Sequence, residues 1–307
     1  IPIFIFDQDL EEYSNIGGAS LWWLEKSLTE LNKKLLENLT IFFGKSSHIL
    51  EALSEKYNVN NVFWNRCYEP DRILSDSKIK IELKKQNVNA VSFNSSLLWE
   101  PWKIKNKQGG IYKVFTPFYK TCTTFIEKPR KPEKHNNDIV FFNKIKTIPG
   151  EFRLYKYKYI SISQHWSAKF AKYWQPGEEG AKKKFDDFFK EGAFFYSEGR
   201  NFPSKKNVSR LSPHIHWGEI SPHKIWHKAH ETLKGENRMI FLSEIGWREF
   251  SYYLLYNFPN IQKENLKKNY DNFEWLNNKN MIELWKKGKT GYPIVDAGMK
   301  ELWDTGY

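Results

Sequence analysis

The residues best suited to chemistry lie together in a mostly apolar stretch near position 245. Glu244 and Arg248 are four positions apart, and Trp247 follows Glu244 by three, so a helix would place all three side chains on one face. There the indole could stack on a flat substrate while the Glu244 carboxylate hydrogen-bonds the substrate's polar edge. The alternative is a surface ion pair between Glu244 and Arg248 beside a core tryptophan. Spacing alone favours this alternative.

A second candidate is the segment 207–213, with the sequence NVSRLSP, which precedes a helical stretch. Backbone N–H groups and hydroxyls before a helix suit phosphate oxygens. Serines in such positions are also common helix caps. The segment alone therefore indicates phosphate binding only weakly.

Two further patterns imitate known sites. His223, His227 and His230 fall on one helical face, as the ligands of a metal site can, but no cysteine is nearby and no HExxH pattern is present. The stretch 285–290 resembles the end of a P-loop, although the first glycine of that motif would fall at Glu283 and a helix rather than a strand precedes it. We therefore expect no metal site here, and we expect Gly288 to end a helix.

Length and composition bound the class of protein. The 307 residues predict about two domains, and 48 Lys and Arg against 36 Asp and Glu give a net charge of +12. That excess indicates either a polyanionic partner such as nucleic acid or a solvated lysine-rich surface. The aromatic content of 17% excludes a disordered chain. The sequence has no apolar run of about 18 residues, so we expect no membrane span.

The cysteines and tryptophans carry less information. Two cysteines, Cys67 and Cys122, cannot build a disulfide framework or a cysteine-rich zinc site, which fits a reducing, cytoplasmic location. The 13 tryptophans are an unusual number, but packing in the core is the ordinary role of any single one.

The elements that must position these residues fall into two parts. Residues 1–125 alternate strand patterns with amphipathic helix patterns, and this alternation predicts a doubly wound α/β domain with a parallel sheet. The expected strands are 1–6, 40–43, 61–64 and 88–93, and the expected helices are 20–38, 46–57 and 75–86.

The second part should be helical. Prolines and weak periodicity over 126–165 predict a connection between domains. Periodic apolar residues then predict an all-α domain over 166–307. Its expected helices are 178–192, 222–234, 237–258, 280–287 and 293–303.

Ordered motifs run through nearly the whole chain. They are GASLWWL at 18–24, WNRCYEP at 64–70, YKVFTPF at 112–118, WQPGE at 174–178, SRLSPH at 209–214, WGEISP at 217–222, WREF at 247–250 and GKTGYPIVDA at 288–297. Together they resemble the photolyase and cryptochrome family, in particular the bacterial class I cyclobutane pyrimidine dimer photolyases.

The resemblance implies an α/β antenna domain followed by an all-α domain that holds FAD. It implies that light excites the reduced flavin, which passes an electron to a pyrimidine dimer flipped out of the DNA; the ring splits and the electron returns. A basic rim for the DNA backbone would account for the net charge. We expect a cytoplasmic monomer. The antenna chromophore stays open between methenyltetrahydrofolate, a deazaflavin and none.

The resemblance also assigns residues to the flavin. Val208 stands where the family usually has threonine, and Phe241 replaces a tryptophan of some relatives. The positions that match the FAD-binding residues are Tyr196, Ser209, Arg210, Leu211, Ser212, Phe241 and Arg248.

A further set matches the substrate and electron-transfer positions. Glu244 matches the carboxylate that hydrogen-bonds the dimer, and Trp247 matches the indole that stacks on it, a contact that by analogy with base stacking contributes about 1–3 kcal/mol. Arg200 matches an arginine that contacts DNA. Trp275 matches the outer member of a tryptophan relay that photoreduces the flavin.

The resemblance places further family segments outside this chain. The two inner relay tryptophans and the segments that contact the flavin ring would follow 302–306, and a first antenna strand would precede Ile1. We therefore expect the chain to be a fragment that binds FAD poorly and does not repair DNA by itself, although its parent protein does.

Other functions stay open at this point. A cryptochrome-type photoreceptor would share the fold and FAD but would signal instead of repairing DNA; the pair Glu244 and Trp247 favours repair. A nucleic-acid-binding module without cofactor would account for the charge but not for the 209–212 segment. An enzyme acting on 6–4 photoproducts fits the motifs less well.

Overall fold

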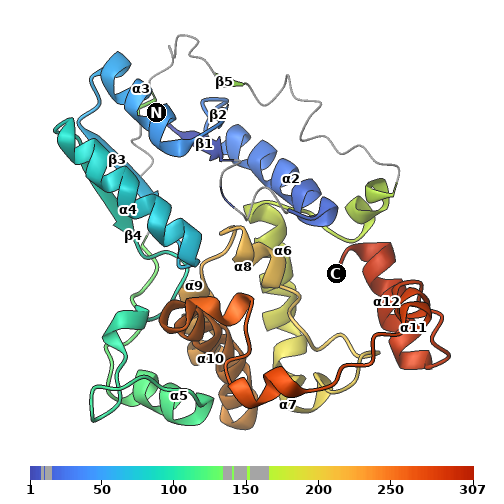
Figure 1. The fold of residues 1–307 in the computed structure, drawn as a ribbon. Coiled ribbons are helices and arrows are strands. Elements are labelled where there is room, and N and C mark those ends of the chain that lie inside the picture. The colour runs from blue at the N-terminus through green and yellow to red at the C-terminus, as the bar shows by residue number, and fades with distance from the viewer. Residues whose placement is uncertain (8–9, 11–15, 134–139, 142–150, 153–165) are drawn as a thin grey trace.

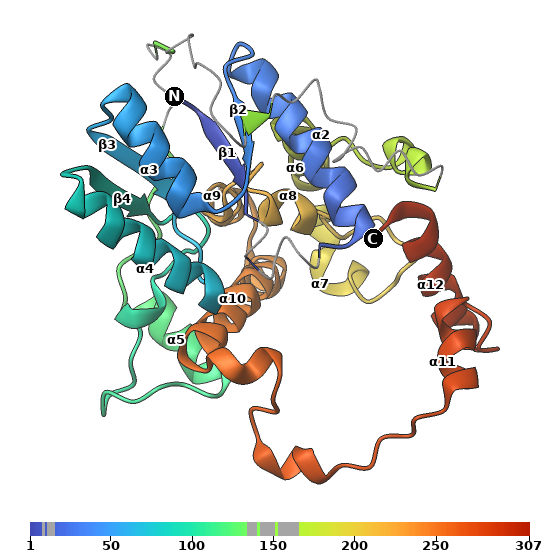
Figure 2. The ribbon, with the colours of Figure 1, turned by 45° about the horizontal axis from the view of Figure 1, so that its top comes forward.

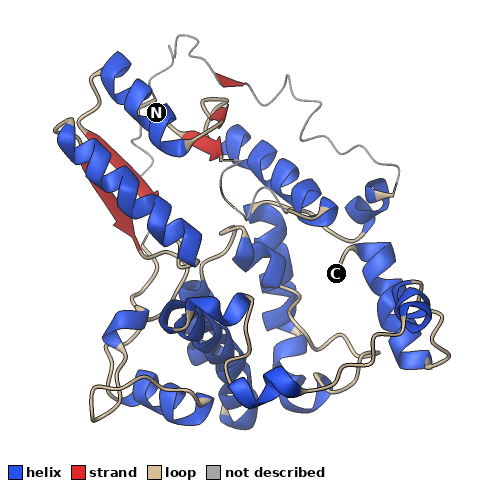
Figure 3. Cartoon of the chain, in the orientation of Figure 1, coloured by secondary structure: helices blue, strands red, loops and turns tan. Residues whose placement is uncertain are grey.

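Strands gather in the first hundred residues, and helices dominate the rest of the chain (Figure 1 and Figure 3). The computed structural model describes residues 1–307 except 8–9, 11–15, 134–139, 142–150 and 153–165. Most of the connection expected over 126–165 lies outside the described residues. In the described part, no helix is long and apolar enough to cross a membrane.

The first part alternates strand and helix as the sequence predicts. The strands β1 (Ile3–Phe6) and β2 (Thr40–Phe43) pair in parallel, and so do β3 (Asn61–Asn65) and β4 (Asn89–Phe93). The intervening helices are α2 (Gly18–Lys34), α3 (Ser46–Tyr57) and α4 (Pro70–Lys85). The α/β class with parallel pairing is confirmed. A short β5 (Glu151–Phe152) adds an antiparallel partner to β2.

The strands form two sheets instead of the one doubly wound sheet that we expected. A cavity of about 720 Å³ separates the sheets; it is lined by Ile3–Ile5 of β1 and all of β3, and none of the described lining residues belongs to β2 or β4. Apolar side chains of α3 and α4, including Leu50 and Ile79, also line it. The alternation of elements predicted the crossovers, but it could not predict which strand edges would meet.

Two helix predictions need correction. The helix expected at 75–86 begins five residues earlier, where Pro70 occupies the first turn and lacks only an N–H that would be unpaired there. The helix α5 (Phe115–Thr124) was not predicted. Its aromatic and β-branched residues have modest helix propensity, so packing must stabilise it; Phe118 and Cys122 are fully buried.

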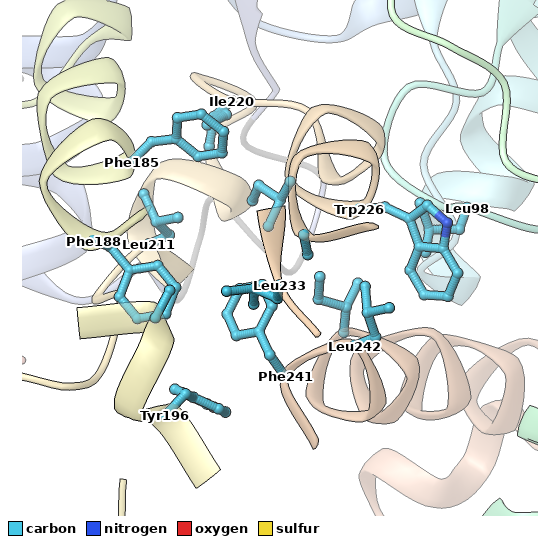
Figure 4. Close-up of a cluster of buried hydrophobic side chains, with 14 of the residues drawn as sticks. Leu98, Phe185, Phe188, Tyr196, Leu211, Ile220, Trp226, Leu233, Phe241 and Leu242 are labelled. Carbon is cyan, nitrogen blue, oxygen red and sulfur yellow. The ribbon is translucent and has the colours of Figure 1, made fainter. Parts of the chain in front are cut away.

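The main core lies in the helical part. It joins α6 (Glu178–Lys190), α9 (Pro222–Thr232) and α10 (Gly235–Asn257) through Phe185, Trp226 and Phe241 (Figure 4). The same cluster includes Leu98 and Trp99, which follow β4, and side chains of α5. Burial of shared apolar surface therefore connects the two parts.

The remaining helical elements are short. They are α7 (Tyr196–Gly199), α8 (Ser212–His216) and the 3₁₀ turns at Pro101–Lys103, Ser167–Lys172, Gly192–Phe195, Pro259–Gln262 and Lys268–Asn272.

The last two helices lie apart from α10. After α10 the chain runs in a wide arc to α11 (Lys279–Lys286) and α12 (Pro293–Thr305) (Figure 2). Gly288 follows α11 at φ +60°, which confirms the predicted glycine stop. The Asp296 carboxylate accepts hydrogen bonds from the N–H groups of Thr290 and Gly291, so the stretch that resembles a P-loop is a closed turn.

Candidate functional site

The predicted chemical face of α10 has different partners from those that spacing suggested. The Glu244 Oε1 accepts a hydrogen bond from Arg200 Nη1 at 2.5 Å. Arg248 instead donates to the Ser96 carbonyl at 2.7 Å and pairs with Glu249 at 3.1 Å. The alternative of an ion pair between Glu244 and Arg248 is therefore wrong. The helix directs these two side chains to different neighbours.

Four of the predicted site residues form one contiguous group. The Arg200 guanidinium lies 5.3 Å from the centre of the Tyr196 ring, and that ring meets Phe241 edge to face at 5.1 Å. The hydrogen bond to Glu244 raises the pKa of Arg200, so the guanidinium stays charged. The structure thus joins residues from α7 and α10 that are more than 40 positions apart.

Trp247 stands at the edge of this group and presents its ring to solvent. The side chain is 47% exposed. One face of the indole stacks on Phe115 of α5, with 3.8 Å between ring centres and 11° between planes. No sequence pattern indicated this contact, because α5 was not predicted.

Glu249 is a site residue that the sequence analysis missed. Its carboxylate is 3% exposed and accepts hydrogen bonds from the Leu98 and Trp99 N–H groups at 2.7 and 3.3 Å. Burial raises the pKa of Glu249 to about 7, although Arg248 and the two N–H groups oppose the shift. The carboxylate therefore ties α10 and Arg248 to the chain after β4. Only the tertiary contacts distinguish it from any other helical glutamate.

The segment Ser209–Ser212 lies against the end of α12. Leu211 is buried in the main core, and the Ser212 hydroxyl donates to the Tyr307 hydroxyl at 3.1 Å. Arg210 adopts a left-handed backbone conformation at φ +50° and forms an ion pair with Glu301. The Ser209 side chain accepts a long hydrogen bond from the Leu211 N–H at 3.4 Å. The Ser212 hydroxyl and the Arg210 guanidinium thus lie beside the end of the chain, whereas the Ser209 hydroxyl bonds within its own segment.

A cavity of about 350 Å³ adjoins Ser212. Its lining is largely aromatic and comes from α2, the 170–174 turn, α8 with the residue after it, and the chain end. The aromatic lining residues are Trp22, Trp23, Phe170, Trp174, His216, Trp217 and Tyr307.

A buried carboxylate holds the elements around this cavity together. Glu219 accepts hydrogen bonds from Trp23 Nε1 at 3.0 Å and from the Gly177 N–H at 2.6 Å. It also bonds His214 Nδ1 at 2.5 Å. These contacts join α2 of the α/β part to α6 and α8 of the helical part.

Trp275 and the histidines lie outside this arrangement. Trp275 is 75% exposed on the arc after α10, and its ring packs on Phe273 with 4.7 Å between ring centres, so the structure does not bring it to the other predicted residues. His227 Nε2 bonds backbone carbonyls at Pro129 and Arg130, and His230 packs on Trp226. In the described ranges, no group of three His, Cys, Asp or Glu side chains could hold a metal ion.

Comparison with known proteins adds an independent finding. Residues 1–134 match the family model for DNA photolyase, and residues 241–307 match the model for the FAD binding domain of DNA photolyase. The deoxyribodipyrimidine photo-lyase of Agrobacterium fabrum is 36% identical over the whole chain, which covers 64% of that protein. Cryptochrome-1 of Arabidopsis thaliana is 30% identical over the whole chain, which covers 46% of that protein.

A solved structure shows the same fold. The crystal structure of a bacterial class III photolyase from Agrobacterium tumefaciens superposes with a TM-score of 0.90 at 35% identity and covers all of this chain and 64% of that chain. The expected class I assignment is therefore not confirmed. This chain spans 64% of each of the two Agrobacterium photolyases and about half of the cryptochrome.

Proposed function

Because the chain belongs to the photolyase and cryptochrome family, we propose that its protein repairs cyclobutane pyrimidine dimers in DNA by light-driven electron transfer from FAD. The observation that carries this proposal is that the exposed Trp247 and the partly buried Glu244 share one face of α10, with Arg200 bonded to Glu244. This group combines a carboxylate, an open indole face and a cation within one patch.

The three side chains suit an extruded dinucleotide. The exposed face of Trp247 can stack on a base, a contact that contributes about 1–3 kcal/mol. Glu244 can accept hydrogen bonds from the polar edge of a pyrimidine, and Arg200 can pair with a flanking phosphate. In this proposal the protein orients the dimer, and its net charge of +12 favours the approach of DNA.

The matching FAD-binding family model indicates FAD as the cofactor. The hydroxyls of Ser209 and Ser212 and the guanidinium of Arg210 form a donor set that fits the pyrophosphate. The buried aromatic edge formed by Tyr196 and Phe241 suits the apolar part of the cofactor. When bound, reduced FAD supplies the electron that opens the dimer ring.

The chain's own residues would adjust to the cofactor. The Ser212 hydroxyl would give up its hydrogen bond to the Tyr307 hydroxyl and bond a phosphate oxygen instead. Arg210 would likewise give up its ion pair with Glu301 and pair with the phosphate. Leu211 keeps the segment in place through its burial in the core. Arg248, held by the Ser96 carbonyl and Glu249, is the remaining residue that the family match assigns to the flavin.

A cryptochrome-type photoreceptor is the second candidate. The 30% identity to Arabidopsis cryptochrome-1 over the whole chain favours it. A sensor would need FAD but no grip on a dimer, so Glu244 and Trp247 distinguish the two candidates.

A repair assay tests the proposal. The full-length natural protein would be reduced, mixed with an oligonucleotide that contains one thymine dimer and illuminated with blue light; chromatography would then measure restored thymine. Light-dependent restoration that Glu244→Gln reduces supports repair. Flavin absorbance without any restored thymine would refute repair and leave the photoreceptor.

A further inference from the structure

Three aromatic rings stand nearly parallel where α5 meets α10. The planes of Tyr119 and Phe115 differ by 15° with 5.2 Å between ring centres. The planes of Phe115 and Trp247 differ by 11° with 3.8 Å between centres. Phe250 closes the group from the side, with its ring edge-on to Phe115 at 5.9 Å.

The close approach of the two helices depends on a glycine. A Cβ atom built on Gly246 would lie 2.5 Å from the Tyr119 ring and 3.4 Å from Phe115. Real Cβ atoms do not approach other atoms to 2.5 Å, so any larger residue at 246 would have to displace the Tyr119 ring. Gly246, one position before Trp247, therefore lets the aromatic face of α5 reach the indole.

The stack gives the indole one covered face and leaves the side chain 47% exposed. An indole on a solvent-facing helix position would otherwise sample several rotamers and would lose that freedom when it binds a base. The Phe115 ring removes this cost in advance, because it holds the indole plane before any ligand arrives.

We propose that Phe115 is a positioning residue that orients the Trp247 indole for the pyrimidine dimer, an inference that rests on the proposed function. The dimer would stack as a further flat group on the open face of Trp247. Phe115 touches the indole and not the substrate, and its own orientation is held by Tyr119 and Phe250.

The first test is spectroscopic and needs no DNA. The chain would be labelled with 5-fluorotryptophan, and Trp247→Phe would identify the fluorine resonance of Trp247. We expect Phe115→Leu to move that resonance toward the position of the exposed Trp275, because the ring-current effect of the stack is lost. Phe115→Tyr keeps a ring in place and should leave the resonance near its original position. An unchanged resonance in Phe115→Leu would overturn the proposal.

The second test measures preference for the lesion. Fluorescence anisotropy would give the Kd of the full-length natural protein for a dimer-containing duplex and for the undamaged duplex. Ordering one side chain on binding reduces affinity by roughly 2- to 12-fold, so Phe115→Leu should reduce the dimer preference by that factor and leave undamaged DNA unaffected. Phe115→Tyr should restore the preference.

A matched control separates this effect from general loss of packing. Phe125, at the end of α5, is 69% exposed and is not part of the ring stack on Trp247, so Phe125→Leu should leave both Kd values unchanged. A full dimer preference in Phe115→Leu would overturn the positioning role alone. A wild-type protein without any dimer preference would overturn the proposed function, and the inference would fall with it.

Discussion

Because Arg200 and Glu244 form an ion pair, removing the Glu244 charge should change the affinities for undamaged and damaged DNA in opposite directions. Both residues belong to the proposed DNA-binding face, yet in the structure without DNA they form an ion pair with each other. A DNA phosphate must compete with Glu244 for the Arg200 guanidinium. Glu244→Gln should therefore strengthen binding to undamaged DNA while it weakens recognition of the dimer.

The structure sets the size of the two effects. The side chains of Arg200 and Glu244 are 29% and 37% exposed, and partly exposed pairs contribute at most about 1 kcal/mol. Freeing Arg200 should thus raise affinity for undamaged DNA by about 2- to 5-fold. It should also steepen the slope of log K against log salt by about 0.9, the value for one added phosphate contact. For the dimer, glutamine keeps a neutral acceptor, so the loss should be about tenfold, near the lower limit for hydrogen bonds to charged groups.

Anisotropy titrations of damaged and undamaged duplexes over a range of salt concentrations would measure both effects. Glu198→Gln is the matched control, because it removes the same charge from an exposed ion pair with Lys205 and should change the salt slope little. The reasoning fails if Glu244→Gln weakens binding to undamaged DNA, or if its slope equals that of Glu198→Gln.

Three further predictions concern buried polar groups. Burial raises the pKa of Glu249 to about 7 in the folded chain, above its unfolded value. Its contribution to the free energy of unfolding is therefore complete below about pH 4.5 and is lost as the pH rises through 7. Relative to Glu249→Gln, denaturant titrations should show the wild-type free energy of unfolding larger by up to about 3 kcal/mol at acidic pH than at high pH. Burial lowers the pKa of His223 to about 4, so the pH dependence has the opposite sign. Relative to His223→Gln, the wild-type free energy of unfolding should be greatest above about pH 6.5 and should fall by up to about 3 kcal/mol as the pH drops through 4. Glu219→Ala leaves three buried donors without their carboxylate, and chemical denaturation should show a loss of about 3–5 kcal/mol; a loss under 1 kcal/mol would show that water replaces the carboxylate.

The two titrations nearly cancel in the wild-type curve, because one contribution declines with rising pH and the other with falling pH over almost the same range. Each must therefore be measured as a difference between wild type and a single variant at each pH. A parallel pair of curves for wild type and Glu249→Gln would contradict the buried environment assigned to that carboxylate.

Local pattern predicted most of the elements that carry the site. The Ser221 cap, the proline at the start of α9 and the glycine after α11 all lie where the sequence placed them. These signals are local, since a cap or a stop depends on backbone groups within a few residues. The membership of Glu244 and Trp247 in one helix followed from the same local periodicity.

The partners of those side chains could not be predicted in this way. Glu244 pairs with Arg200, 44 positions away, and not with Arg248 on its own helix. Spacing along a helix defines which side chains share a face. It does not tell whether a side chain will pair with a residue four positions away or with a residue from another element. The division of the strands into two sheets has the same origin, because strand pairing is a choice among edges that only the folded chain brings together.

The sequence by itself thus determined the class of the two parts, the bounds of most helices and, through its ordered motifs, the family. The tertiary structure decided which charges meet, which carboxylates are buried and which face of Trp247 stays open. The physical reason is that helix periodicity, caps and turns depend on neighbours in the chain, whereas ion pairs, desolvation and ring stacking depend on groups brought together by packing.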